Sequence, residues 1–141
     1  MNAIVVGTDG SAGAEAAIRK IIELAQGKAQ TVNLVCAYPG RSVLERLGMT
    51  AKTDPIDLRG VAMDVLARDE RRFEDAGFDV ELHAREGDPA EVLIDVAREQ
   101  KAELIVVGAR GDSSSRHFTL GSVASKLTHH APSSVMIVRA D

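Results

Sequence analysis

Five short runs of apolar residues recur along the chain, and each is bounded by turn residues. Two of them, Ala3 to Val6 and Leu104 to Val107, are unbroken, rich in β-branched residues and followed directly by a glycine. Such runs are typical of strands that are buried on both faces, as in a parallel sheet. Three further strand candidates, in which apolar and polar residues alternate only imperfectly, are Val32 to Ala37, Val80 to Ala84 and Val135 to Val138.

Between these runs, apolar residues recur every three or four positions, which predicts four helices. The helices are expected from the residue after Ser11 to Gly27, from Leu58 to Ala76, from Asp88 onward, and from Ser122 to the residue before Pro132. The second ends at Gly77, a natural left-handed terminator. The third opens with an N-cap Asp88, a proline at the first helical position and a glutamate three residues after the cap.

The alternation of strands and helices predicts an open α/β sheet with right-handed crossovers. Ligands of such sheets bind outside the carboxyl ends of the strands. The 141 residues contain no internal repeat and no linker, so we expect one domain over residues 1–141. The long stretch from Pro39 to Asp54 is either a mobile flap or a loop that carries a short helix.

Composition narrows the class of partner. One Tyr, three Phe and no Trp weigh against recognition of single-stranded nucleic acid by base stacking. The chain has a formal net charge of −4, so it lacks the overall positive charge of a typical DNA-binding protein. The single cysteine, Cys36, suits a reducing compartment. No apolar run reaches the roughly 18 residues of a membrane span, so we expect a cytoplasmic protein that binds neither nucleic acid nor membrane.

Glycines follow the fourth predicted strand at a regular spacing. Gly108 and Gly111 are separated by two residues, and Gly121 comes after nine more, directly before Ser122 at a predicted helix start. A helix N-terminus offers free N–H groups and a partial positive charge, so anionic phosphate is its natural ligand. From Leu104 to Arg139 four basic residues accompany a single acid, which makes this segment locally positive. The alternative is a set of turn glycines beside a solvated serine loop.

A carboxylate stands at the end of the first predicted strand, in the sequence Gly7-Thr8-Asp9-Gly10-Ser11. If the first and fourth strands are neighbours, this turn and the Gly108 loop lie side by side at one edge of the sheet. A carboxylate in that place can accept hydrogen bonds from ribose hydroxyls, as an acid does in dinucleotide sites. The alternative for Asp9 is an Asx turn or a helix cap.

Three segments stand in register along the chain: the strand end VVGTDGS, the Gly108, Gly111, Gly121 and Ser122 spacing, and the ending APSSVMIV. Together they resemble the universal stress protein family, in its ATP-binding branch. The resemblance implies a Rossmann-like fold of the adenine nucleotide alpha hydrolase type, with four helices on both faces of five parallel strands in order 3-2-1-4-5. It also implies ATP, ADP or AMP as ligand, a role in stress adaptation or signalling, and a homodimer paired through Val135 to Val138.

The same resemblance assigns site residues by position. Asp9 would bind ribose or adenine alongside Thr8. The backbone of Ala37 would contact adenine, and Val107 would lie against the nucleotide. The phosphates would be surrounded, mostly through backbone amides, by Gly108, Arg110, Gly111, Gly121, Ser122 and Val123.

Phosphoryl transfer requires positioned Mg²⁺ ligands and a residue that orients the nucleophile. The sequence has neither a P-loop pattern nor a paired set of acids, so we expect slow ATP hydrolysis or none. Asp9 and Asp112 are candidates to help hold Mg²⁺ through the phosphates.

Two other classes of protein fit the sequence less well. A phosphoacceptor receiver domain has a similar sheet, of order 2-1-3-4-5, but requires clustered acids at the first strand, where Asp9 has no acidic neighbour. A nucleotide-free stress protein that acts through protein contacts is disfavoured by the complete glycine pattern.

The remaining candidates have simpler interpretations. His129 and His130 point about 100° apart on a helix, which disfavours a shared metal ion, and we expect no metal site. His117 either touches phosphate or is a solvated loop residue, and Cys36 is expected in the core. The RDERR segment from Arg68 to Arg72 is expected to be a solvated helix face.

Overall fold

All five predicted strands form, and they pair in one parallel sheet. We describe a computed structural model that covers residues 3–26, 28, 31–48, 57–110 and 120–140. The strands are β1 (Ala3–Gly7), β2 (Thr31–Tyr38), β3 (Asp79–Glu86), β4 (Leu104–Gly108) and β5 (Ser134–Val138). Strand β3 is longer than predicted because it pairs with β2 along its whole length, from Thr31 opposite Asp79 to Tyr38 opposite Glu86.

The described residues form five helices, one more than the four predicted. They are α1 (Ala12–Ala25), α2 (Arg41–Arg46), α3 (Leu58–Asp75), α4 (Pro89–Glu99) and α5 (Ser122–His130). The additional helix, α2, buries none of its six residues, so it lacks the apolar periodicity by which the others were predicted. The stretch from Pro39 to Asp54, predicted to be either a mobile flap or a loop with a short helix, therefore does carry a short helix. Residues 49–54 lie outside the described residues. None of the described helices is long and apolar enough to cross a bilayer.

The predicted start of α4 and the predicted end of α3 are confirmed. The Asp88 carboxylate accepts a hydrogen bond from the Glu91 N–H at 3.1 Å, with Pro89 as the first residue of α4. Gly77 follows α3 with a φ of 90°, the left-handed conformation that favours glycine. These signals lie within one helical turn of the boundary that they mark, which is why the sequence alone reveals them.

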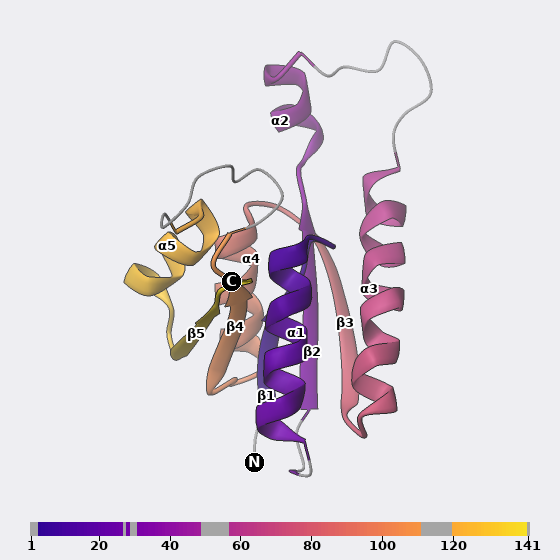
Figure 1. The fold of residues 1–141 in the computed structure, drawn as a ribbon. Coiled ribbons are helices and arrows are strands. Elements are labelled where there is room, and N and C mark those ends of the chain that lie inside the picture. Colours follow the sequence, from indigo (N-terminus) through magenta and orange to yellow (C-terminus); the bar gives the residue numbers. More distant parts are fainter. Residues whose placement is uncertain (1–2, 27, 29–30, 49–56, 111–119, 141) are drawn as a thin grey trace.

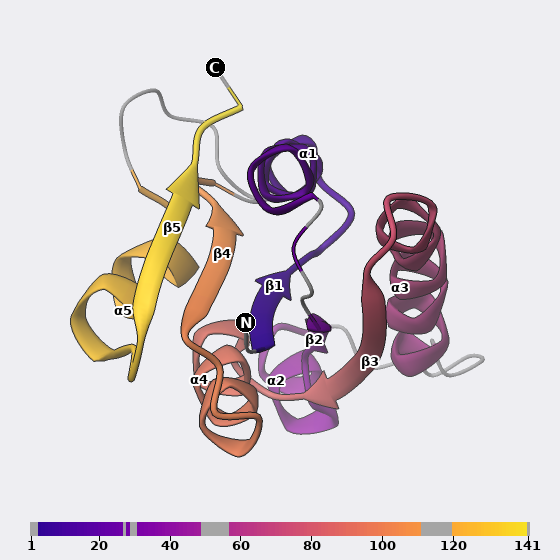
Figure 2. The same cartoon turned by 90° about the horizontal axis from the view of Figure 1, so that it is seen from below.

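Two helices cover each face of the sheet, α1 and α3 on one side and α4 and α5 on the other (Figures 1 and 2). Alternate residues of β1 therefore enter different cores: Ile4 and Val6 pack toward α1 and α3, whereas Val5 packs toward α4 and α5. Residues 4–6 of β1 and 105–107 of β4 are buried on both faces, as the unbroken apolar runs of these two strands predict.

The strand order is β3-β2-β1-β4-β5, as the resemblance implied. This order differs from the 2-1-3-4-5 of a receiver domain and excludes that alternative. The order reverses between β1 and β4, which pair directly in parallel, with Val6 opposite Val106. Their carboxyl ends consequently meet at the switch point of the sheet, where ligands of such folds bind.

Candidate functional site

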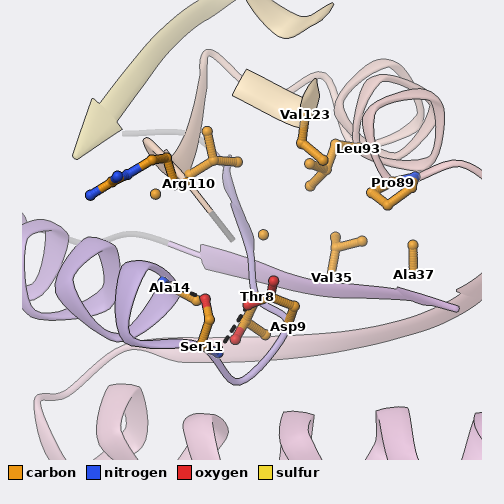
Figure 3. A pocket seen from close by; sticks show the side chains of 13 residues that line it. Thr8, Asp9, Ser11, Ala14, Val35, Ala37, Pro89, Leu93, Arg110 and Val123 are labelled. Atoms are coloured by element: carbon orange, nitrogen blue, oxygen red, sulfur yellow. Dashed lines mark hydrogen bonds between the residues drawn. The ribbon is translucent and has the colours of Figure 1, made fainter. Parts of the chain in front are cut away.

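A pocket opens at the switch point, above the carboxyl ends of β1, β2 and β4 (Figure 3). It encloses about 570 Å³, including the space that merges with solvent. The residues that line it are Gly7, Thr8, Asp9, Ser11, Ala14, Val35, Ala37, Pro89, Leu93, Val107, Gly108, Arg110 and Val123. The pocket thus draws on three strands, the starts of α1, α4 and α5, and the residues after β4.

The two sides of the pocket differ in chemistry. Val35 and Ala37 of β2 face Leu93 of α4 and Val123 of α5, and together they make an aliphatic wall (Figure 3). The opposite side is the polar turn between β1 and α1, which carries Asp9. An apolar cleft with a few convergent polar groups is the usual form of a small-molecule site.

The turn between β1 and α1 is tied by its own side chains. The Asp9 Oδ1 accepts the Ser11 N–H at 2.9 Å, and the Ser11 Oγ accepts the Ala14 N–H at 3.2 Å as the N-cap of α1 (Figure 3). Gly10 has a φ of 81°, which makes glycine the suitable residue between them. Asp9 therefore forms the Asx turn considered as its alternative role, and its side chain is exposed at the pocket.

Beneath this turn lies a buried acid, Asp69 of α3, which is only 1% exposed. The Thr8 hydroxyl donates to the Asp69 Oδ2 at 2.7 Å, in a contact between residues that are 61 positions apart. The prediction of a solvated face from Arg68 to Arg72 is therefore wrong for Asp69. The reason is helical spacing: Asp69 is three residues after Leu66 and four before Phe73, so it shares their buried stripe. That spacing is the signal in the sequence that distinguishes Asp69 from the charged residues around it.

The two acids also affect the neighbouring cysteine. Burial, together with the negative charges of Asp9 and Asp69, raises the pKa of the Cys36 thiol to about 11. Cys36 is 6% exposed and belongs to the core on the α1 and α3 side, as predicted. A thiol with this pKa is protonated at neutral pH and is a poor nucleophile.

The start of α5 is the other notable element of the site. The Gly121 N–H donates to the Ala109 carbonyl at 2.7 Å, which holds the helix start beside the end of β4. Gly121 is the N-cap of α5 and has no side chain to accept from the first helical N–H groups. By contrast, α1, α3 and α4 are capped by the side chains of Ser11, Asp57 and Asp88. Among these four helices, α5 is therefore the one that offers its N-terminal N–H groups to an anion.

One of the four basic residues between Leu104 and Arg139, Lys126, already forms an ion pair with an acid of the protein. The Lys126 ammonium of α5 contacts the Asp88 Oδ1 at 3.0 Å and so bridges α5 to the start of α4. The pKa of Asp88 is lowered: partial burial raises it, but the hydrogen bonds from Lys126 and from the Glu91 N–H outweigh that effect. Lys126 is thus an interhelical contact in this structure, and Arg110 is the one basic residue among the described residues that line the pocket.

Seven of the ten predicted site residues line the pocket: Thr8, Asp9, Ala37, Val107, Gly108, Arg110 and Val123. Gly121 and Ser122 form the start of α5 next to Val123, although they are not lining residues. Gly111 lies outside the described residues, as do Asp112, the serine loop and His117. The structure thus brings the β1 turn and the β4 end together, as the strand order requires.

Sequence reasoning missed the contribution of α4 and of the start of α1. Pro89 and Leu93 of α4 line the aliphatic wall, and Ser11 and Ala14 line the polar side. A usable signal existed, because each helix of a parallel α/β sheet begins at the edge where ligands bind. The helix start at Asp88 and Pro89 therefore indicated a segment near the pocket.

Gly108 has a second role that its spacing did not indicate. A Cβ built on Gly108 would lie 2.6 Å from the Gly13 carbonyl carbon and oxygen, and one built on Gly13 would collide with the Arg110 carbonyl oxygen. The first turn of α1 therefore rests directly on the end of β4. The absence of both side chains is required by this close packing, in addition to any contact with a ligand.

Within the described ranges, no group of three or more His, Cys, Asp or Glu side chains is arranged to hold a metal ion. His129 and His130 are exposed, and the His129 Nδ1 lies 3.0 Å from the Ser125 carbonyl oxygen.

Comparison with known proteins identifies the relatives of this fold and site. The sequence profile of the universal stress protein family matches residues 1–139. Universal stress protein Rv1636 of Mycobacterium tuberculosis is 31% identical over 138 residues, which cover 96% of this chain and 94% of that protein.

Solved structures share the architecture. The structure of hypothetical protein MJ0577 superposes with a TM-score of 0.84 at 23% identity, and the match covers 98% of this chain and 95% of that chain. A universal stress protein in complex with cAMP superposes with a TM-score of 0.72 at 26% identity, over 99% of this chain and 98% of that chain.

Proposed function

Because this chain belongs to the universal stress protein family, we propose that it is a stress-response regulator that binds an adenine nucleotide, with ATP as the expected ligand. The nucleotide would occupy the pocket at the switch point, with its base on the aliphatic wall and its phosphates at the start of α5. A single observation carries the proposal: the pocket joins an aliphatic wall to a helix N-terminus whose N-cap is glycine. The cAMP complex of a relative with the same fold supports this ligand class.

The aliphatic wall suits a purine. The pocket lining contains no aromatic side chain among the described residues, so the base would rest on Val35, Leu93 and Val107 through van der Waals contact. Ala37 would contribute its backbone, because a side chain of one carbon leaves the end of β2 accessible.

The phosphates require positive potential and N–H donors. Ser122 and Val123 would supply backbone N–H groups at the positive end of the α5 dipole, whereas Gly121, whose own N–H is bonded to the Ala109 carbonyl, would let the phosphates approach closely. Arg110 also lines the pocket, and Gly108 and Gly111 would leave room for the phosphates. Asp9 would accept hydrogen bonds from the ribose hydroxyls, with Thr8 beside it.

We propose slow or absent hydrolysis. Asp9 is the one carboxylate among the lining residues that the structure describes, so a second acid to hold a metal or orient water is not part of that lining. Mg²⁺ would enter with the phosphates of ATP. Fast ATP turnover that disappears in Asp9→Ala would contradict this part of the proposal.

The experiment that tests the function has two steps. The purified protein is first denatured, and any small molecule that is released is identified by mass spectrometry. ATP, ADP, AMP and cAMP are then titrated into the ligand-free protein by calorimetry. We expect an adenine nucleotide in the first step or saturable binding of at least one of the four in the second. Absence of both results would overturn the proposal and favour the nucleotide-independent alternative.

We also propose a homodimer paired through β5. This strand forms one edge of the sheet, and its residues Val135, Met136 and Ile137 are only partly buried. The other edge, β3, carries the charged residues Asp79 and Glu81, which discourage pairing with a second chain. Light scattering coupled to size-exclusion chromatography should give twice the monomer mass; the mass of a single chain would contradict the dimer.

A further inference from the structure

We propose that Asp69 is a positioning residue of the nucleotide site: from beneath the pocket, it holds the turn that presents Asp9. The inference rests on the proposed function, since its consequence is measured as nucleotide affinity. It concerns a residue that lines no part of the pocket and lies on α3, a helix that contributes no lining residue.

The first step of the argument is the geometry of the Thr8 hydroxyl. Its hydrogen is donated to the Asp69 Oδ2 at 2.7 Å, and its oxygen accepts the Gly10 N–H at 3.2 Å. Thr8 is 6% exposed, so the hydroxyl is held by these two partners away from bulk water. Both bonds depend on one orientation of the side chain, and the carboxylate of Asp69 sets that orientation.

The second step links this hydroxyl to Asp9. Thr8 anchors the backbone at Gly10, and the next residue, Ser11, donates its N–H to the Asp9 Oδ1 at 2.9 Å. The backbone N–H of Thr8 is bonded to the Val35 carbonyl at 2.9 Å, so the start of the turn is tied to β2. A hydrogen-bonded path therefore runs from α3 through Thr8 and the turn to the carboxylate that faces the pocket.

The third step is that α3 packs over the same turn. A Cβ built on Gly10 would lie 3.4 Å from the Val65 side chain and 3.6 Å from the Arg68 Nη2. The Arg68 Nε also lies 3.3 Å from the Asp69 Oδ1, which places a positive charge beside the buried acid. Together, Val65, Arg68 and Asp69 restrain the turn from the face opposite the ligand.

The choice of residue favours a positioning role over a purely structural one. Asp69 lies on the helix face between Leu66 and Phe73, both fully buried. An apolar side chain at this position would pack against them without the cost of removing a charged group from water. Burying a carboxylate is costly even when it is hydrogen-bonded, and apolar replacements of buried ionic groups are often as stable or more stable. An acid at this place therefore serves the geometry of the turn more than the stability of the core.

The test compares Asp69→Asn with Asp64→Asn, which makes the same chemical change at an exposed position of the same helix. In Asp69→Asn, an NH2 group replaces one of the two oxygens that accept from Thr8 and Arg68, and the oxygen that remains is uncharged. We expect the Kd for ATP to rise by roughly tenfold, the effect of losing one charged hydrogen bond. Asp64→Asn should leave the Kd unchanged.

Two further variants separate the hydroxyl from side-chain size. Thr8→Val keeps the shape but removes the hydroxyl, and it should weaken ATP binding as Asp69→Asn does. Thr8→Ser keeps the hydroxyl, so its Kd for ATP should be close to that of the parent protein. Hydrogen exchange of the Gly10 and Ser11 amides, measured without nucleotide, should be faster in Asp69→Asn and Thr8→Val than in Asp64→Asn.

The outcomes distinguish the two proposals. If the parent protein binds nucleotide and Asp69→Asn only lowers the melting temperature, with the Kd and the exchange rates unchanged, the positioning role is wrong while the proposed function stands. If the parent protein binds none of the four nucleotides, the proposed function fails. In that case, faster amide exchange at Gly10 and Ser11 in Asp69→Asn would still support the inference that Asp69 positions the turn. Unchanged exchange at these two amides would overturn that inference.

Discussion

Gly108→Ala is expected to lower the free energy of unfolding by about 1–3 kcal/mol, the range found for overpacked sites. The added Cβ would lie 2.6 Å from the Gly13 carbonyl carbon and oxygen, so backbone rather than a flexible side chain would have to move. Moving the first turn of α1 away from β4 would also disturb the turn that carries Asp9. Urea denaturation and a thermal melt measure the effect, and the melting temperature should fall by roughly 3–10 °C.

Gly7→Ala is the matched control for this variant. Gly7 and Gly108 are the last residues of the neighbouring strands β1 and β4. The atoms nearest to a Cβ on Gly7 would be side-chain atoms of Leu93 and Val107, at 3.1–3.2 Å, and those side chains can adjust. We expect a smaller loss of stability in Gly7→Ala, with weaker nucleotide binding because Leu93 would be pushed toward the pocket. Equal losses of stability in the two variants would contradict the close-packing role of Gly108.

Asp9→Ala is expected to raise the Kd for ATP by about 10- to 100-fold, since a hydrogen bond to a charged group contributes about 1.5–3 kcal/mol. The physical reason is loss of the carboxylate that would accept the ribose hydroxyls. Calorimetric titration measures the Kd. The same titration with 2′-deoxy-ATP tests the assignment, because the preference for ATP over the deoxy form should shrink in Asp9→Ala.

Two controls accompany the Asp9 variant. Asp75→Ala removes the same charge at an exposed position, at the far end of α3 from the pocket, and should leave the Kd unchanged. Asp9→Asn keeps an oxygen that can accept the Ser11 N–H, so it separates the turn from the charge. If Asp9→Ala binds ATP as tightly as the parent protein, Asp9 is only the Asx-turn residue of this loop.

The sequence predicts the strands and long helices well because their signals are local. The unbroken run of β1 and the glycine after α3 act within a few residues of the elements that they define. The same holds for the start of α5 at Gly121 and Ser122, whose chemistry toward anions follows from a helix N-terminus alone. Helix α2 was not among the predicted helices because its six residues, none of them buried, carry no periodic apolar pattern.

The full lining of the pocket could not be predicted from local signals, because the pocket is assembled from segments that are distant in the sequence. Pro89 and Leu93 face the β1 turn across the switch point, and Asp69 reaches Thr8 from 61 positions away. In sequence, Asp69 reads as one acid within a charged run, and only its spacing from Leu66 and Phe73 distinguishes it. Gly13 likewise reads as one residue of a helix and Gly108 as one glycine of a ligand loop, and only the structure shows that the backbones of α1 and β4 touch there.

By itself, then, the sequence determined the order and type of the main elements, the glycine-rich start of α5 and the acid that follows β1. The tertiary structure decided which of these meet. It paired β1 with β4, placed α4 opposite the Asp9 turn and buried Asp69 beneath it. The physical reason is that hydrophobic periodicity and capping act over a few residues. A binding site, by contrast, depends on contacts that form only when the sheet is assembled and α3 packs on its face.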